Sequence, residues 1–384
     1  MQTQYSLAVP GNVICGVGCV KRLPDIIQLK GTERLSVLVD VGVLKSGKID
    51  TLLQTLRDRF SHVALVTDVP PEPEEGQVRV IFDQVQDSGA QCVVAIGGGS
   101  VMDTSKIIAV MLQNPGYYTD LTDTAQIACP GVPLIAVPTS AGTGSEATPN
   151  AIILIPEKKQ KVGVIHSYFL PQAVLLDAEL TCSLPPTVTA ATGLDAFCHC
   201  IETYISRKTN PFSRLFGLRG MELVQRYLRR AYTDGNDMEA RENMLLAAFY
   251  GGVAITASST VAVHALSYPL GGFYRIPHGI SNAVLLPYVM SYNIDSISDC
   301  VPALAQALGL PAQDGGKGQG QQVIEALFSL CADVHIPNNL RMFNIHEKDL
   351  EFLTVSASRV HRLLDQNPKV MSLEDIRSIY AQLL

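Results

Sequence analysis

The sequence has no run of about 18 consecutive apolar residues, which is the length that a membrane-spanning helix requires. Its first residues, MQTQYSLAVPGNVICG, have no basic segment followed by a long apolar run, and a secretory signal peptide needs both. Excess positive charge is also absent, because the formal net charge is −7. We therefore expect no membrane span, no signal peptide, and no basic surface for nucleic acid or an anionic membrane.

A paired-cysteine zinc motif is missing as well. The nine cysteines are scattered, and Cys92, Cys129 and Cys198 lie in apolar patterns. Cys15 and Cys19 are spaced CxxxC, but no second pair completes a zinc site. This cysteine usage indicates reduced thiols that pack in the interior, and it predicts a cytoplasmic protein.

What the 384 residues do contain is a change of pattern near residue 183. Before it, short β-branched runs alternate with helical stretches, which predicts βαβ units around a parallel sheet. The predicted strands are 36–39, 63–66, 92–96, 134–137, 151–155 and 173–176, and the predicted helices are 47–60, 76–88 and 101–112. A hydrophobic fraction of 47% fits a buried sheet of this kind.

After Ser183-Leu184-Pro185-Pro186 the pattern is mainly helical. The clearest predicted helices are 187–206, 211–231, 237–257 and 320–331. We therefore predict an α/β dinucleotide-binding domain at residues 1–183 and an all-α metal-binding domain at residues 184–384. Chains of this organisation usually bind ligands in the cleft between their domains.

Two glycine-rich loops follow predicted strands. Gly97-Gly98-Gly99-Ser100 lies between the strand 92–96 and a helix that begins at 101. Glycine lets the backbone approach a phosphate, and a helix N-terminus favours an anion. The second loop, 139–146 (TSAGTGSE), interleaves hydroxyl groups with glycine. A tight turn explains either loop alone, but two loops on one sheet favour a dinucleotide.

The usual dinucleotide fingerprint, GxGxxG, is absent, because Gly16-Val17-Gly18 has no such continuation. Asp40 ends the strand 36–39. A carboxylate in that place can bond ribose hydroxyls and repel a 2′-phosphate. A solvated strand-end carboxylate explains Asp40 equally well.

Four residues in the helical half have the chemistry of a metal site. Asp195 and His199 are spaced i, i+4 and lie on one face of a helix, and Glu202 continues that stripe as a candidate to orient a ligand. His264 and His278 follow in two further segments. Oxygen and imidazole donors together suit Fe²⁺, Zn²⁺ or Mn²⁺.

Each of these residues also has a plainer explanation. Asp195 and His199 fit one polar stripe, His264 fits a satisfied core histidine, and His278 fits a helix cap. His264 lies in an apolar helix that Pro269 and the glycines after it are expected to end. Spacing alone does not show whether the four side chains converge.

At these residues the chain resembles the iron-containing (group III) alcohol dehydrogenases. The resemblance runs through about residue 293, and beyond residue 300 it extends only to helical character. Five segments match the family in order: GGGSVMDTSK, PTSAGTGSEAT, ATGLDAFCHCIETYIS, HALSYPLGG and IPHGISNAVLLP.

The resemblance implies a dehydroquinate-synthase-like fold, an α/β nucleotide-binding domain followed by a helical domain. It implies that Asp195, His199, His264 and His278 bind the catalytic metal, with Fe²⁺ first and Zn²⁺ as the alternative. It implies NAD as the cofactor, with NADP second, and a homodimer or larger homo-oligomer. The implied cofactor contacts are Asp40, Gly97, Gly98, Ser100, Asp103, Thr139, Ser140, Thr143, Asn150 and Lys161.

Two positions depart from the family pattern. Many members carry a second histidine where this chain has Tyr268, so a proton relay there would fall to Tyr268 or to water. Glu72 precedes Pro73, where the family often has asparagine near the adenosine. An acid at this position either weakens the cofactor contact or points away from it.

The expected reaction is the interconversion of an alcohol and its aldehyde or ketone by hydride transfer with NAD(H), the metal polarising the substrate oxygen. The alternative is a lyase or cyclase of dehydroquinate-synthase type, which needs more basic residues than Lys106, Lys161 and Arg275. A third reading is a non-catalytic nucleotide- or metal-binding protein. Four potential ligands together with two cofactor loops argue against it.

The substrate itself stays open among simple alcohols, diols, hydroxy acids, and sulfonated or phosphonated alcohols. Arg275 could bind an anionic substrate tail or be solvated. A set of apolar and aromatic residues lines a cleft or simply packs in the core: Phe197, Ile255, Tyr268, Phe273 and Tyr274.

Overall fold

The computed structural model describes residues 4–29, 31–156, 160–311 and 318–384. These residues form two compact units, Ala8–Leu184 and Pro185–Leu384, and the second unit also includes the N-terminal segment that ends at Leu7. The ring of Tyr5 packs edge-on against Phe212 at 5.8 Å, which attaches that segment to the helical unit. The predicted fold class, an α/β part followed by an all-α part, is confirmed.

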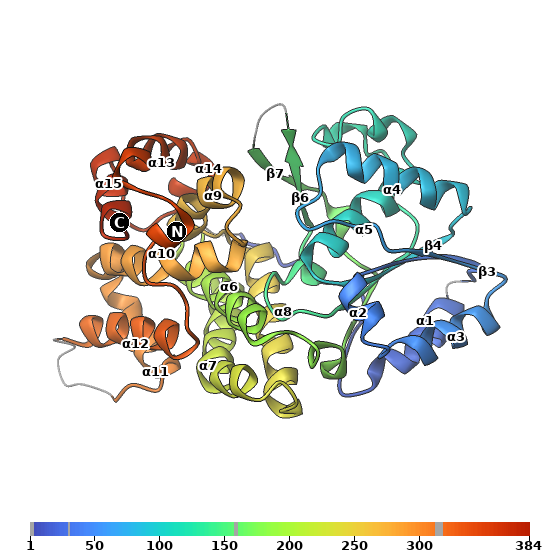
Figure 1. The fold of residues 1–384 in the computed structure, drawn as a ribbon, viewed down its shortest axis with the longest axis horizontal. Coiled ribbons are helices and arrows are strands. Elements are labelled where there is room, and N and C mark those ends of the chain that lie inside the picture. The colour runs from blue at the N-terminus through green and yellow to red at the C-terminus, as the bar shows by residue number, and fades with distance from the viewer. Residues whose placement is uncertain (1–3, 30, 157–159, 312–317) are drawn as a thin grey trace. The chain divides into compact units, whose positions relative to one another are not determined.

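The α/β unit is built on a parallel six-stranded sheet with the strand order β1-β8-β5-β4-β2-β3 (Figure 1). The strands are β1 (Val13–Cys15), β2 (Arg34–Val39), β3 (His62–Val66), β4 (Cys92–Gly97), β5 (Leu134–Pro138) and β8 (Ala173–Leu176). Every residue of β4 is buried, because this strand lies inside the sheet and both sheet faces are covered. That burial explains its continuous apolar run.

Helices cover both faces of this sheet, with α4 and α5 on one face and α1 and α3 on the other (Figure 1). The helices are α1 (Leu23–Gln28), α2 (Val41–Lys45), α3 (Asp50–Arg59), α4 (Glu75–Asp87) and α5 (Gly99–Met111). Leu23, Ile27 and Leu56 pack with Val37 and Val94 in one hydrophobic core. This packing fixes the strand ends from which the glycine-rich loops project.

The predicted strand at 151–155 forms, but it does not join the parallel sheet. It lies in β6 (Asn150–Ile155), which pairs with β7 (Gln160–Ile165) in a separate antiparallel ribbon. The backbone N–H of Leu154 donates to the carbonyl of Pro73 at 3.1 Å, which ties the ribbon to the segment before α4.

The helical unit contains α6 (Pro186–Ile205), α7 (Pro211–Thr233), α8 (Met238–Ala257), α9 (Ala262–Tyr274), α10 (His278–Asn293), α11 (Val301–Ala307), α12 (Gln319–Asp333), α13 (Leu350–Ser358), α14 (His361–Leu364) and α15 (Leu373–Ala381). Helix α6 is buried along nearly its whole length. A Cβ on Gly220 of α7 would lie 2.3 Å from the Cys200 sulfur. Glycine therefore lets α7 pack closely on α6.

Pro269 does not end α9, contrary to the sequence-based expectation. The helix continues to Tyr274, and it ends where Arg275 adopts a left-handed conformation with φ 54°. A proline inside a helix removes one hydrogen bond and bends the helix without always ending it. The C-terminus is set instead by Arg275, whose N–H bonds back to the carbonyl of Leu270.

Among the described residues, no single helix has both the length and the apolar content of a membrane span. Helices α8 and α9 reach that threshold only when they are taken together, across a bend of 108°.

Candidate active site

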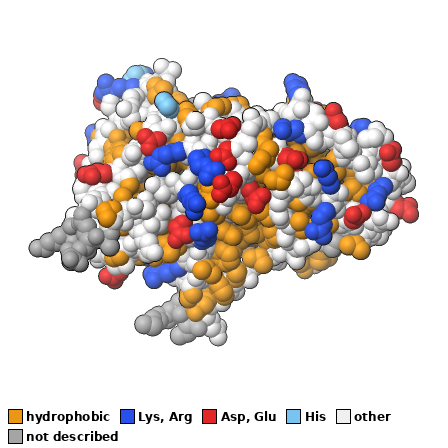
Figure 2. Space-filling model, turned by 90° about the horizontal axis from the view of Figure 1, so that it is seen from below, with side chains coloured by type: hydrophobic (Ala, Val, Ile, Leu, Met, Phe, Trp, Pro, Cys, Tyr) orange, Lys and Arg blue, Asp and Glu red, His pale blue; other side chains and the backbone are white. Residues whose placement is uncertain are grey.

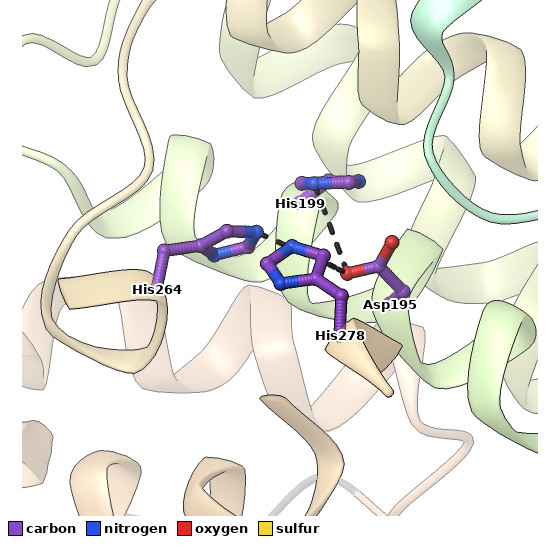
Figure 3. A group of neighbouring side chains, drawn as sticks. All are labelled: Asp195, His199, His264 and His278. Atoms are coloured by element: carbon purple, nitrogen blue, oxygen red, sulfur yellow. Dashed lines mark ion pairs between the residues drawn. The ribbon is translucent and has the colours of Figure 1, made fainter. Parts of the chain in front are cut away.

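The helical unit brings together the four side chains that the sequence singled out. Asp195 and His199 come from α6, His264 from α9, and His278 is the first residue of α10. One ligand atom from each lies within 4.8 Å of all the others. The Asp195 Oδ1 is 3.9 Å from the Nε2 atoms of His199 and His264, and 3.7 Å from that of His278. Figure 3 shows the three imidazole rings gathered around this carboxylate.

A close helix contact makes this convergence possible. A Cβ on Gly279 would lie 2.2 Å from the carbonyl oxygen of Ala191 on α6. Only glycine therefore lets the first turn of α10 approach α6 so closely. As a result His278 reaches the side chains on the next turn of α6, although these residues are distant in the sequence.

Glu202 orients His264. The carboxylate of Glu202 is fully buried and forms a very short hydrogen bond with His264 Nδ1. Its other oxygen accepts the backbone N–H groups of Val261 at 3.1 Å and Val263 at 2.7 Å, so it also satisfies the start of α9. With the proton held at Nδ1, the His264 Nε2 presents its lone pair to the other ligands. The predicted orienting role of Glu202 agrees with this geometry.

The charges of the cluster are balanced internally. Burial by itself raises the pKa of Asp195, but His199, His278 and His264 together hold the pKa below its usual value. Burial lowers the pKa of His264, and the carboxylates of Glu202 and Asp195 more than offset this effect, so that pKa is raised. The centre is thus an ionised carboxylate surrounded by imidazole groups.

This set fits a divalent metal. A tetrahedral ion with donors at about 2.1 Å has neighbouring donors about 3.4 Å apart. The observed separations of 3.7 and 3.9 Å need only a small inward movement. One carboxylate and three imidazoles are borderline donors, which suit Fe²⁺ or Zn²⁺ better than Ca²⁺.

Asn282 also belongs to this centre, and the sequence analysis missed it. Its side chain is fully buried on α10, and its Nδ2 lies 2.7 Å from the Asp195 Oδ1. The spacing of four residues from His278 was the available signal, because it places both side chains on one helix face.

Tyr268, the residue that stands in place of the family histidine, lies one turn after His264 on α9. Its hydroxyl is 3.5 Å from the Nη2 of Arg362, a residue that the sequence analysis did not select. Burial and Glu202 raise the pKa of Tyr268, although Arg362 opposes them. Tyr268 is therefore a neutral phenol at physiological pH.

The suggested substrate-lining residues differ in burial. Phe197 is fully buried, as core packing predicts. Phe273 is 46% exposed, and its ring packs edge-on against Phe352 at 4.5 Å. Arg275 ends α9 in a left-handed conformation. For Phe197 the plainer explanation, core packing, agrees with its burial, and Arg275 is exposed, as a solvated side chain would be.

In the α/β unit, the two glycine-rich loops touch each other. The N–H of Thr139 donates to the carbonyl of Gly97 at 3.0 Å. A Cβ on Gly98 would lie 3.2 Å from the Ser140 hydroxyl, and one on Gly99 would lie 2.8 Å from the Thr143 methyl group. Gly98 precedes α5 directly, so the two loops meet at a helix N-terminus, which is a favourable place for a phosphate.

Asp40 lies beside these loops, at the carboxyl end of β2. Its N–H donates to the carbonyl of Ile96 at 2.9 Å. Its Oδ1 accepts the N–H groups of Gly42 at 2.8 Å and Val43 at 3.2 Å, so it caps α2. Neither of the sequence-based interpretations of Asp40 included this capping role.

Asp103 points into the unit. Its carboxylate is buried and accepts the Ser145 hydroxyl at 2.5 Å and the N–H of Ile152 at 3.0 Å. Burial raises its pKa, while the nearby Lys106 opposes that shift. Asp103 therefore connects α5 with the second glycine-rich loop and with β6.

Lys106 makes the matching contacts on the next turn of α5. It is fully buried, and its Nζ donates to the Ser145 hydroxyl at 2.7 Å and to the carbonyl of Asn150 at 2.6 Å. Burial lowers its pKa to about 8. The backbone of Asn150, one of the expected cofactor contacts, is thus held from inside the unit.

Glu72 and Lys161 pair with each other. The Lys161 Nζ lies 2.5 Å from the Glu72 Oε1. The backbone N–H of Glu72 also donates to the Ser100 hydroxyl at 3.0 Å. The acid that departs from the family pattern is therefore engaged by Lys161, an expected cofactor residue.

Both units of the chain match known proteins of one family. Residues 10–178 match the iron-containing alcohol dehydrogenase family, and residues 189–384 match the C-terminal part of the Fe-containing alcohol dehydrogenase family. The long-chain-alcohol dehydrogenase 1 of Geobacillus thermodenitrificans is 38% identical over 371 residues, which cover 95% of this chain and 93% of that protein.

Solved structures show the same relationship. The crystal structure of a 1,3-propanediol oxidoreductase superposes with a TM-score of 0.95 at 30% identity, covering 99% of this chain and 100% of the other. A sulfoacetaldehyde reductase from Bifidobacterium kashiwanohense, solved in complex with NAD⁺, superposes with a TM-score of 0.89 at 27% identity, covering 99% of both chains. The chain belongs to the iron-containing alcohol dehydrogenase family.

Proposed function

We propose that Asp195, His199, His264 and His278 hold the catalytic metal of this NAD-dependent alcohol dehydrogenase, with Fe²⁺ as the expected ion. The carrying observation is the convergence of four ligand atoms from three helices within 4.8 Å. When bound, the metal acts as a Lewis acid on the oxygen of the alcohol or aldehyde, and the nicotinamide exchanges the hydride. The lyase alternative is not favoured, because the relatives are alcohol and aldehyde oxidoreductases.

The chain's own residues prepare this centre. Asp195 stays ionised, since its pKa is held low, and supplies one negative donor. Glu202 keeps the proton of His264 on Nδ1 and leaves Nε2 to bind. Tyr268 keeps its proton, so we assign it the role of a hydrogen-bond donor that works with water in proton transfer.

The α/β unit is the proposed dinucleotide-binding part, and the helical unit the metal-binding part. The two glycine-rich loops are proposed to bind the pyrophosphate, through Gly97, Gly98, Ser100, Thr139, Ser140 and Thr143. Asp40 is proposed to favour NAD over NADP, because its carboxylate would repel a 2′-phosphate. Asp103, Asn150 and Lys161 complete the proposed set, Asp103 by holding Ser145 in place.

The proposed assembly is a homodimer or larger homo-oligomer in the cytoplasm. Strand β1 lies at an edge of the sheet and exposes Val13, and an unpaired edge strand is a common contact between copies. None of the nine cysteines, all of which lie in the described part of the chain, forms a disulfide, which suits a reducing compartment. Light scattering of the purified protein measures the assembly; a monomer at micromolar concentration contradicts it.

Nucleic acid and membrane surfaces are not proposed as partners. On the face drawn in Figure 2, Lys and Arg side chains are interspersed with Asp and Glu, so this face has no broad basic area.

The test is to measure metal content and NAD(H)-linked turnover on one purified batch with a panel of short alcohols and aldehydes. We expect near-stoichiometric iron or zinc and turnover that disappears when the metal is removed. A folded protein that binds neither metal nor nucleotide would refute the proposal.

A further inference from the structure

We propose that Asn282 is a positioning residue of the metal centre, whose side-chain amide holds Asp195 in its ligating orientation. This inference rests on the proposed metal site. Asn282 lies one turn after His278 on α10 and is completely buried. Neither the family motif nor the metal-ligand spacing assigned it a role.

The amide nitrogen faces three of the four ligands. The Asn282 Nδ2 is 2.7 Å from the Asp195 Oδ1 and 3.2 Å from the Nε2 atoms of His264 and His278. A carboxamide has only two N–H groups, so at most two of these contacts are full hydrogen bonds at one time. The contact with Asp195 is the shortest and involves a charged acceptor, which makes it the strongest.

The orientation of the amide follows from Asp195. With the amide reversed, the Oδ1 of Asn282 would face the Asp195 carboxylate at hydrogen-bond distance, acceptor against acceptor. In the observed orientation the Oδ1 is buried without a hydrogen-bond partner among the described residues. Burying such an oxygen costs about 1–3 kcal/mol. The fold accepts this cost, which indicates that the N–H donated to Asp195 has a function.

The two contacts between Asn282 and the histidines are expected to differ between the metal-free and the metal-bound centre. In the neutral ring that donates Nδ1–H to Glu202, the Nε2 of His264 is an acceptor. Without an ion, the second N–H of Asn282 can satisfy this lone pair or that of His278. With an ion, those lone pairs are used for coordination, and only the hydrogen bond to Asp195 remains. Asn282 thus keeps the ligands preorganised before the ion binds.

Preorganisation of the ligands increases the affinity of the site for its metal ion. Partners that orient a metal ligand typically change metal affinity by about 10- to 100-fold when they are removed. Asn282→Leu is the informative change, because leucine has nearly the same shape and has no N–H. It fills the buried space, so loss of packing does not dominate the result.

A matched control exists on the same helix. Asn293 is also completely buried on α10, and its side chain exchanges hydrogen bonds of 2.9 and 2.8 Å with Asn367. This pair of hydrogen bonds involves no metal ligand. Asn293→Leu therefore removes a buried amide of α10 from a structural contact only.

The experiment measures Zn²⁺ dissociation constants of the metal-stripped whole protein by competition with a chelator, without nucleotide. We expect about 10- to 100-fold weaker binding in Asn282→Leu and a change below about threefold in Asn293→Leu. We also expect an altered visible spectrum of the Co²⁺-loaded Asn282→Leu protein, because the Asp195 ligand shifts. Should Asn282→Leu not fold, Asn282→Ser is measured in the same way.

The outcomes separate this inference from the proposed function. If wild type binds no Zn²⁺ or Co²⁺ at all, the metal site itself is refuted. If wild type binds, and the folded Asn282 variant binds equally well with an unchanged Co²⁺ spectrum, then Asn282 has only a packing role and this inference is overturned.

Discussion

The metal centre of the helical unit and the glycine-rich loops of the α/β unit recognise their ligands in different ways. The centre consists of side chains from three helices that are distant in the sequence. The loops offer backbone and hydroxyl groups from two adjacent strand ends, β4 and β5. Loss of one side chain should therefore disable the centre, whereas the loops share binding among many groups.

The buried charges of the two units also differ. Around the metal site, the carboxylates of Asp195 and Glu202 lie against imidazole groups, which stabilise their negative charge. Below the loops, Asp103 and Glu146 are buried with Lys106, and burial raises the pKa of Glu146 to about 7. We therefore expect the stability of the α/β unit to change with pH as Glu146 titrates.

The largest effect is expected at the metal centre. His264→Ala removes one ligand, and we expect loss of both bound metal and turnover. Lewis-acid catalysis contributes several kcal/mol, which corresponds to a decrease of about 10³-fold or more in kcat/KM. Metal analysis and steady-state kinetics measure it, with His62→Ala, an exposed histidine of the α/β unit, as the control. Normal turnover in a metal-depleted variant would refute the prediction.

The second prediction concerns pH and the α/β unit. Burial raises the pKa of Glu146 in the native state to about 7, from the ordinary glutamate value of 4.5. Between these values the native state binds more protons than the unfolded state, so stability falls as the pH rises from 4.5 to 7. The loss amounts to about 3 kcal/mol at pH 8.

Glu146→Gln stays neutral at every pH and should remove this slope. Urea unfolding of the whole chain at pH 5 and pH 8 measures it, with the same change at the exposed Glu33 as the control. Equal slopes in wild type and Glu146→Gln would mean that Glu146 is ionised in the native state throughout.

The third prediction tests whether a partner of a ligand matters as much as the ligand. Glu202→Gln keeps the shape of the side chain but removes the charge that holds His264. We expect metal affinity to fall by about 10- to 100-fold, while catalysis survives at saturating metal. Glu222→Gln is the control, because Glu222 forms a surface ion pair with the exposed Arg219 at 2.7 Å. Unchanged affinity in Glu202→Gln would show that the backbone alone positions His264.

The smallest effect is expected at the loops. Asp40→Ser keeps a side chain that can cap α2 and removes the charge that would repel a 2′-phosphate. We expect the preference for NAD over NADP to narrow by about tenfold, roughly 1.4 kcal/mol. Ratios of kcat/KM for the two cofactors measure it. An unchanged ratio would place the discrimination elsewhere, for example at Glu72.

Much of the fold was available from the sequence, because local patterns determine it. Alternation of β-branched runs and helices predicted the α/β part, and the long helical patterns after Pro186 predicted the all-α part. Two sequence-based expectations failed because tertiary contacts, and not the local pattern, decided the outcome. Pro269 was expected to end α9, but the helix continues to Tyr274. The strand at 151–155 was listed with those of the parallel sheet, but it pairs with β7 in a separate ribbon.

For the metal site as well, the sequence determined one part and the tertiary structure the other. The residue types and spacing of Asp195, His199, His264 and His278 were sufficient to select them, since few residues ligate metals. Their convergence was decided by the tertiary structure, through the contact of Gly279 with α6. The same holds for Asn282 and for the inward turn of Asp103. A side chain's type is written in the sequence, but its neighbours depend on helix packing that brings distant residues within a few ångströms.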